Sequence, residues 1–118
     1  MITTLKIPAG SEVRFGRPAR PLPVELRDSI ARGLSSISEI HEAHLPMCYV
    51  PATMREPVHI LVVVFGQETA LNSVMPAISK AIGAIMPAGK HLDVLPLKTG
   101  NSLIDVVRGA NCQLSITA

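Results

Sequence analysis

The stretch P-V-H-I-L-V-V-V-F, residues 57–65, decides the fold of this chain of 118 residues. From Val58 to Phe65 only His59 is polar, and valine and isoleucine predominate. A short run rich in β-branched residues is typical of a buried strand at the centre of a sheet. The run is less than half of the roughly 20 residues that a membrane-spanning helix needs. We therefore expect a central strand and no membrane contact.

A helix is predicted on the N-terminal side of this strand. Apolar residues recur at helical spacing after Pro23, whose fixed φ suits a first helical turn. These residues are Leu26, Ile30, Leu34 and Ile37. Before the helix, three prolines within residues 16–23 indicate a linker, and residues 12–15 indicate a short strand.

Residues 39–50, between this helix and the central strand, alternate in the manner of a strand with one partly wet face. The two expected faces carry Ala43, Leu45 and Met47 on one side and Ile40, Glu42 and His44 on the other. Pro46 has no amide donor, so it favours an edge position or a bulge. We expect this strand to pair with residues 58–65 as a hairpin.

A second helical stripe follows the central strand. Apolar residues recur every three or four positions up to Met86, and the pattern stops at Pro87 and Gly89. The members of this stripe are Leu71, Val74, Ile78, Ile82 and Ile85. Because Pro76 lies inside the stripe, either the helix is kinked there or its regular part begins near Ser73.

Three shorter elements complete the chain. Residues 91–97 alternate and predict a third strand. Asn101 or Ser102 can cap a short helix that runs to Arg108 and stops at Gly109. Residues 112–117 are predicted to add a last strand.

The order of these elements places the chain in the α+β class. We expect a mixed or antiparallel sheet with two main helices packed on it and a short third helix. The length of 118 residues fits a single domain over residues 1–118, and 47% hydrophobic residues supply its core.

Charge and aromatic content argue against nucleic acid as a partner. The net charge is +2, and aromatic residues make up only 3% of the chain, which is too few to stack bases. The first ten residues contain no apolar run long enough for a secretory signal, so we expect a cytoplasmic protein. The sequence leaves a homo-oligomer open.

No catalytic, metal or cofactor site is predicted from the sequence. His41 and His44 lie three positions apart on an expected strand, so they point to opposite faces and cannot share a metal ion without local distortion of the strand. No phosphate-binding glycine loop and no nucleophile with a neighbouring base is present. Cys48 and Cys112 lack the spacing of a metal or redox site and are interpreted as buried thiols, with a disulfide left open. We expect a protein that is not an enzyme.

Positive charge is concentrated near the N-terminus. Up to residue 32 the chain has six basic and three acidic residues, whereas the remainder has a net charge of −1. The residues that we assign to this basic face are Arg14, Arg17, Arg20, Arg27 and Arg32. The basic face is interpreted either as a solvated surface or as the binding site of an acidic protein partner that is attracted by charge.

Five motifs carry a resemblance to a known family. They are P-A-G-S-E-V-R-F-G-R-P at 8–18, P-V-E-L at 23–26, I-H-E-A-H-L at 40–45, P-V-H-I-L-V-V-V at 57–64 and M-P-A-G-K-H-L-D-V-L-P-L at 86–97. In this order they resemble the C-terminal domain of SseB, the enhanced serine sensitivity protein, over nearly the whole chain. Residues 43–45 are Ala-His-Leu where the family tends to have Ala-Tyr-Leu, and residues 111–118 replace an aromatic-rich ending. The resemblance implies a stand-alone copy of a bacterial, non-enzymatic α+β domain without catalytic residues to carry over.

Two functions are compatible with these features. We expect a protein-binding module, such as an adaptor or an immunity protein that acts on a toxin or a secreted effector. The alternative is a regulatory domain that senses a small ligand such as an amino acid, because helices packed on an antiparallel sheet also form such domains and the family's name points to serine.

Overall fold

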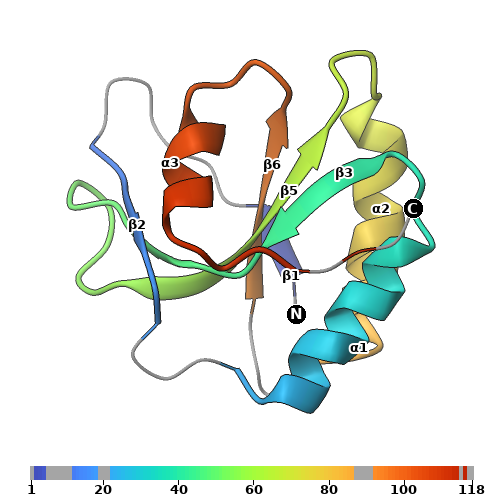
Figure 1. The fold of residues 1–118 in the computed structure, drawn as a ribbon, viewed down its shortest axis with the longest axis horizontal. Coiled ribbons are helices and arrows are strands. Elements are labelled where there is room, and N and C mark those ends of the chain that lie inside the picture. Colours follow the sequence, from blue (N-terminus) through green and yellow to red (C-terminus); the bar gives the residue numbers. More distant parts are fainter. Residues whose placement is uncertain (1, 5–11, 19–21, 87–91, 115, 117–118) are drawn as a thin grey trace.

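Strand β5 (Val58–Phe65) lies in the middle of the sheet, as its apolar run predicts (Figure 1). The computed structural model of the chain describes residues 2–4, 12–18, 22–86, 92–114 and 116. The elements before β5 are β1 (Ile2–Thr4), β2 (Arg14–Gly16), α1 (Val24–Ser35), β3 (Ile40–His44) and β4 (Met47–Tyr49). Those after it are α2 (Leu71–Gly83), β6 (Leu92–Lys98) and α3 (Leu103–Gly109). The fold is therefore α+β, which confirms the predicted class.

The described strands form one mixed sheet in the order β1-β6-β5-β4-β2, with β3 also paired to β5. β5 runs parallel to β6, and α2 makes the crossover that a parallel pair requires. β1 also runs parallel to β6, whereas β2, β3 and β4 form antiparallel pairs. The predicted hairpin between residues 39–50 and β5 is confirmed.

Residues 39–50 form two strands instead of the single strand that we expected. β3 pairs with the C-terminal half of β5, and β4 pairs with its N-terminal end. Between them Pro46 has no amide hydrogen to donate, although its carbonyl accepts a hydrogen bond from Ile60 N at 3.1 Å. The irregularity predicted at Pro46 is thus a break between two strands along one edge of β5.

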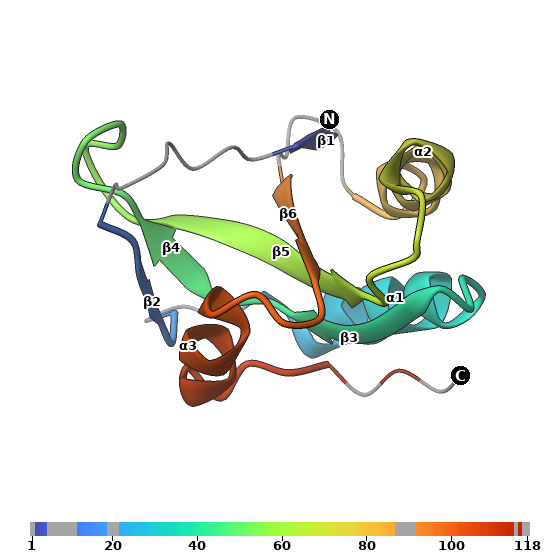
Figure 2. The same ribbon diagram turned by 90° about the horizontal axis from the view of Figure 1, so that it is seen from above.

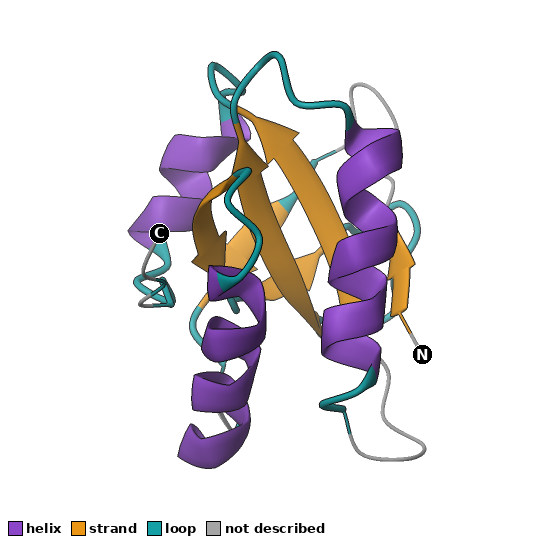
Figure 3. Ribbon diagram, turned by 90° about the vertical axis from the view of Figure 1, so that its right-hand side faces the viewer, coloured by secondary structure: helices purple, strands orange, loops and turns teal. Residues whose placement is uncertain are grey.

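The sheet has a core on each face because β5 is buried on both sides. Alternate side chains of β5 enter two clusters, with Leu61, Val63 and Phe65 in the first and Ile60, Val62 and Val64 in the second. The first cluster is completed by α1 and α2, and the second by α3. Figure 3 shows α1 and α2 in front of the sheet, and in Figure 2 strands β5 and β6 lie between α3 and α2.

The predicted helical stripes form the first cluster. Ile30, Leu34, Ile78 and Ile82 are fully buried, and Leu26 and Ile85 are partly buried against them. Gly33 lets α1 approach α2 closely, because a Cβ at this position would lie 3.0 Å from Ile85 Cδ1. α2 starts at Leu71, before Ser73, so Pro76 is an interior helical residue, and it is exposed to solvent.

Glu42 connects β3 to α3 through an ion pair with Arg108. Arg108 Nε donates to Glu42 Oε1 at 3.0 Å, and Arg108 Nη2 donates to Oε2. His44 Nε2 donates to the same Oε1 at 3.0 Å. Mainly because of the Arg108 hydrogen bonds, and against the effect of burial, the pKa of Glu42 is lowered to about 2.

The expectation of a partly wet face on this strand is wrong at His44, which is completely buried. The Glu42 carboxylate compensates the polar Nε2–H group that burial removes from water. A pattern of alternation could not reveal this, because Gln113, which forms a backbone bridge with His44, is distant from it in the sequence.

Both ends of α3 are fixed by asparagines. Asn101 Oδ1 accepts a hydrogen bond from Leu103 N at 2.9 Å, as expected of a capping residue. Gly109 is the last helical residue, and the left-handed position after the helix is occupied by Asn111, with φ of 57°. The helix therefore ends at Gly109, as predicted, and the left-handed position two residues later holds a residue type that tolerates this conformation.

The chain after Asn111 runs along the free edge of β3. Leu45 N donates to Cys112 O at 2.9 Å, and Leu114 N donates to Ala43 O at 2.8 Å. These bonds frame an isolated antiparallel bridge between His44 and Gln113. The strand expected over residues 112–117 is thus a single bridge, and residues 115, 117 and 118 lie outside the described part of the chain.

Replacement of Ile82 by alanine tests the first cluster. Ile82→Ala should lower the free energy of unfolding by about 2 to 5 kcal/mol, because it removes buried methyl groups and leaves a cavity. Urea unfolding followed by circular dichroism measures this change. Val106→Ala is the control, since Val106 is 49% exposed and its loss should cost under about 1 kcal/mol. Equal costs for the two variants would contradict the assigned core.

Replacement of Glu42 by glutamine tests the link between β3 and α3. Because the folded-state pKa of Glu42 is about 2 and its ordinary value is 4.5, its contribution to stability is present above pH 4.5 and is lost as the pH falls toward 2. Glu42→Gln should destabilise the fold by about 1 to 2 kcal/mol at pH 7 and flatten the loss of stability on acidification. Thermal unfolding between pH 2 and pH 7 measures both effects.

The control for this variant is Asp105→Asn. Asp105 also lies near Arg108, at 3.5 Å, but it is 89% exposed, so its carboxylate is screened by water. Its replacement should leave the acid dependence unchanged. The same acid dependence in wild type and Glu42→Gln would show that Glu42 does not hold the two elements together.

Candidate anion-binding pocket

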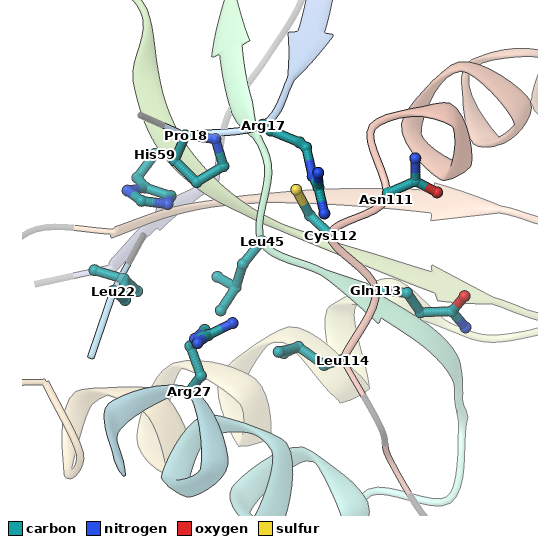
Figure 4. A pocket seen from close by; sticks show the side chains of 10 residues that line it. All are labelled: Arg17, Pro18, Leu22, Arg27, Leu45, His59, Asn111, Cys112, Gln113 and Leu114. Carbon is teal, nitrogen blue, oxygen red and sulfur yellow. The ribbon is translucent and has the colours of Figure 1, made fainter. Parts of the chain in front are cut away.

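A pocket of about 320 Å³ lies between α1, the chain after β2 and the segment that follows α3 (Figure 4). Its lining comes from parts of the chain that are distant in sequence. The lining residues are Arg17, Pro18, Leu22, Arg27, Leu45, His59, Asn111, Cys112, Gln113 and Leu114. The hydrogen bonds between β3 and residues 112–114 position the wall that carries Cys112.

Two arginines provide the charge of this pocket. Arg27 rises into it from the first turns of α1, and the guanidinium of Arg17 approaches from the opposite side, near Cys112 (Figure 4). Neither arginine forms an ion pair within the described part of the chain, and the described lining contains no carboxylate. Nε of Arg27 is buried and has no hydrogen-bond partner among the described residues. The pocket therefore concentrates positive charge that the described side chains around it do not neutralise.

The remaining titratable groups of the pocket are uncharged at neutral pH. Burial lowers the pKa of His59, so its imidazole is neutral at pH 7. Burial also raises the pKa of Cys112, although the charges of Arg17 and Arg27 partly oppose this rise. The effect of both arginines on one thiol places both guanidinium groups within electrostatic reach of Cys112.

Cys112 and His59 line the same pocket but do not form an activated pair. Sγ of Cys112 donates to the carbonyl of Ala110 at 3.3 Å, and the raised pKa keeps the thiol protonated. His59 is not among the groups that shift the pKa of Cys112. The chemistry that the pocket offers is the binding of an anion by two guanidinium groups, beside the apolar side chains of Leu22, Leu45 and Leu114.

The structure divides the predicted basic face. Arg17 and Arg27 meet at the pocket, whereas Arg14 is paired with Glu12 at 2.9 Å. Arg32 lies five residues beyond Arg27 on α1, about 140° around the helix axis, and lines no described pocket. Arg20 lies outside the described residues. The basic face predicted from the sequence therefore contains the two arginines of the pocket. The sequence does not show that these two, out of the five, lie together.

His59 and Cys112 are pocket residues that the sequence patterns do not predict. In the sequence, His59 is the polar residue in the run of the central strand, and Cys112 is interpreted as a buried thiol. Cys112 is only partly buried, whereas Cys48 is completely buried, and the two thiols are free. Asn111 is a sequence signal for the position of Cys112, since an asparagine favours a turn and the turn redirects the residues that follow it.

A second hollow adjoins the pocket at Arg17. It has a volume of about 450 Å³ and is lined by Arg14, Phe15, Gly16, Arg17, Met47, Cys48, Tyr49 and Pro57. Its lining is mostly apolar and its second arginine already has an acidic partner. The first pocket is therefore the stronger candidate for an anion.

The histidines do not form a metal site in the described ranges. His41 is exposed and His44 is completely buried, and the register of β3 shifts between Ile40 and Glu42. Across residues 2–4, 12–18, 22–86, 92–114 and 116, no three metal-ligating side chains come together. In the same ranges no helix has the length and apolarity to cross a bilayer.

Comparison with known proteins identifies a family. A family model described as SseB protein C-terminal domain matches residues 7–110. No curated protein and no solved structure matches the chain.

The two cysteines should differ in reactivity if the pocket is formed as described. In native protein, iodoacetamide should alkylate Cys112 and leave Cys48 unmodified, because Cys48 is completely buried and burial raises its pKa to about 11. The rate at Cys112 should still rise above pH 9, since its pKa is also raised. Mass spectrometry of digested protein measures both rates.

A comparison of Arg17→Gln with Arg32→Gln shows whether the reactivity of Cys112 depends on the charge beside it or on the net charge of the protein. Arg17→Gln should slow alkylation of Cys112 at pH 8, because the Arg17 charge lowers the pKa of this thiol. Arg32→Gln removes the same charge outside the pocket and should leave the rate unchanged. Faster modification of Cys48, or equal rates in the two variants, would contradict the geometry of the pocket.

Proposed function

The chain belongs to the SseB C-terminal domain family, and on this premise we propose that it is a non-enzymatic module that binds an acidic protein partner at the Arg17–Arg27 pocket. An adaptor or an immunity protein that acts on a toxin or a secreted effector would work in this way. The partner would be attracted by the positive charge of the pocket and its surroundings.

The observation that carries this proposal is the convergence of two arginines without a described carboxylate beside them. Like charges repel one another, and the partly buried Arg27 guanidinium gives up hydration without gaining a described partner for Nε. An anion in the pocket would remove both penalties. Stability alone gives no reason for this arrangement, which favours a role in binding.

The neutral groups of the pocket support a non-enzymatic role. The protonated Cys112 thiol is a weak nucleophile, and its Sγ–H donates a hydrogen bond to the Ala110 carbonyl. Neutral His59 is not directed at a described carboxylate that would orient it as a general base.

A second function is favoured by the volume of the pocket. A cavity of about 320 Å³ lies within the size range of small-molecule sites. A regulatory domain that senses an amino acid or a similar small acid is therefore the alternative. A thermal-shift screen with amino acids tests it directly, because a ligand at about 100 times its Kd stabilises the fold by about 2.7 kcal/mol.

Charge reversal at Arg17 tests partner binding. Proteins that the wild-type chain captures from its native host should be captured less by Arg17→Glu, and their association rate with this variant should fall about tenfold at low salt. Arg32→Glu is the matched control, because it changes the net charge equally but lies outside the pocket. Surface plasmon resonance at two ionic strengths measures the association rates of each captured protein.

A wild-type association rate that does not change with salt would contradict the role of charge. Equal effects of the two reversals would show that net charge matters and that the pocket does not. Stabilisation by a free amino acid, together with no captured partner, would favour the sensing function.

A further inference from the structure

We infer that the group bound between Arg17 and Arg27 is a carboxylate on a short aliphatic stem. This inference rests on the proposed function and names the chemical class of the group that the pocket binds. Such a group is offered by a glutamate or aspartate side chain of a partner and by a free small carboxylic acid. The chemistry recognised in the pocket is the same for both sources.

The geometry of the cationic side favours a planar anion. Arginine presents its N–H donors in a flat fork, which matches the two oxygens of a carboxylate. Arg27 has a buried Nε–H without a described acceptor, and Arg17 approaches from the opposite wall (Figure 4). A carboxylate seated between these walls would face a guanidinium group on each side.

The rest of the lining favours a carboxylate over a phosphate. A phosphate ester or inorganic phosphate carries up to two negative charges and is usually held by additional cations or by a group of backbone amides. Here the third basic side chain, His59, is neutral because burial lowers its pKa. The charge of the described lining thus comes from two arginines, which is sufficient for one carboxylate.

The apolar residues of the pocket explain the aliphatic stem. Leu22, Leu45 and Leu114 lie on the side of the pocket next to Arg27 (Figure 4). A stem of one or two methylene groups would contact these side chains while its carboxylate reaches the guanidinium groups. An ion without such a stem would leave this apolar surface exposed to water.

Two matched probes test this inference. The first is glutamate with both backbone ends capped, which has one carboxylate, and the second is the equally capped glutamine, which has the same shape without the charge. Two readouts report binding at Arg27 and at Cys112. They are the NMR shift of the Arg27 Nε–H resonance and the protection of Cys112 from iodoacetamide.

The capped glutamate should shift the Arg27 resonance and slow alkylation of Cys112, and the capped glutamine should do neither. Arg17→Gln and Arg27→Gln should weaken binding about tenfold to a hundredfold, since each removes charge-assisted hydrogen bonds. Arg32→Gln should bind within about twofold of wild type. If Arg27→Gln does not fold, as judged by circular dichroism, Arg17→Gln and the capped glutamine carry the comparison.

Binding measurements with further ligands distinguish a free acid from a partner's side chain as the source of the carboxylate. Binding of free glutamate or glutarate that is about tenfold tighter than that of the capped residue supports a free acid, and equal or weaker binding supports a partner's side chain. Tighter binding of inorganic phosphate than of every carboxylate would overturn the inference. Equal binding of the two capped probes, or no response to any carboxylate at millimolar concentration, would also overturn it.

The proposed function fails in a different way. If carboxylates do not bind in the pocket but capture of a protein partner still depends on Arg17, the inference fails and the protein-binding role stands, with its site moved from the pocket to the surface around Arg17. If carboxylates bind but no partner depends on Arg17, the inference stands and the protein-binding role fails.

Discussion

Burial of β5 on both faces is the constraint on which the rest of the structure depends. A strand of valine and isoleucine cannot leave either face in water, so apolar residues must cover both sides of the sheet. α1 and α2 supply the cover on one side, and α3 supplies it on the other. The segment after α3 returns to the sheet along the edge of β3.

The pocket is a consequence of this return. The segment at Cys112 meets α1 and the chain after β2 beside Leu45, at the point where β3 ends and Pro46 interrupts the pairing with β5. A pocket of about 320 Å³ lies between the segments that meet at this junction. Arg17 and Arg27 lie at this junction, and their side chains give the cavity its charge.

The charged groups are paired at one polar centre of the molecule, around Glu42, and unpaired among the described residues at the other, the Arg17–Arg27 pocket. At β3, Glu42 is surrounded by Arg108 and His44, so its carboxylate gains two partners and the ion pair joins two elements. In the pocket, Arg27 keeps an Nε without a described partner and Cys112 stays neutral. In the first arrangement the charged carboxylate is satisfied, although the neighbouring His44 Nδ1 is buried without a described partner. In the second, a charged guanidinium keeps hydrogen-bonding capacity that a ligand could use.

The sequence by itself determined the local elements. The apolar stripes that begin at Leu26 and Leu71 predict helices, and the run at β5 predicts a central strand. Periodicity can do this because it depends only on residues within a few turns or pleats of one another. The irregularity at Pro46 is also predicted locally, from its missing amide hydrogen. Tertiary structure decided the burial of His44, the parallel partner of β5 and the choice of Arg17 and Arg27 from the basic face. Each of these depends on contact between segments that are distant in sequence. Glu42 and Arg108, for example, lie 66 positions apart, and nothing in the sequence around either residue specifies the other.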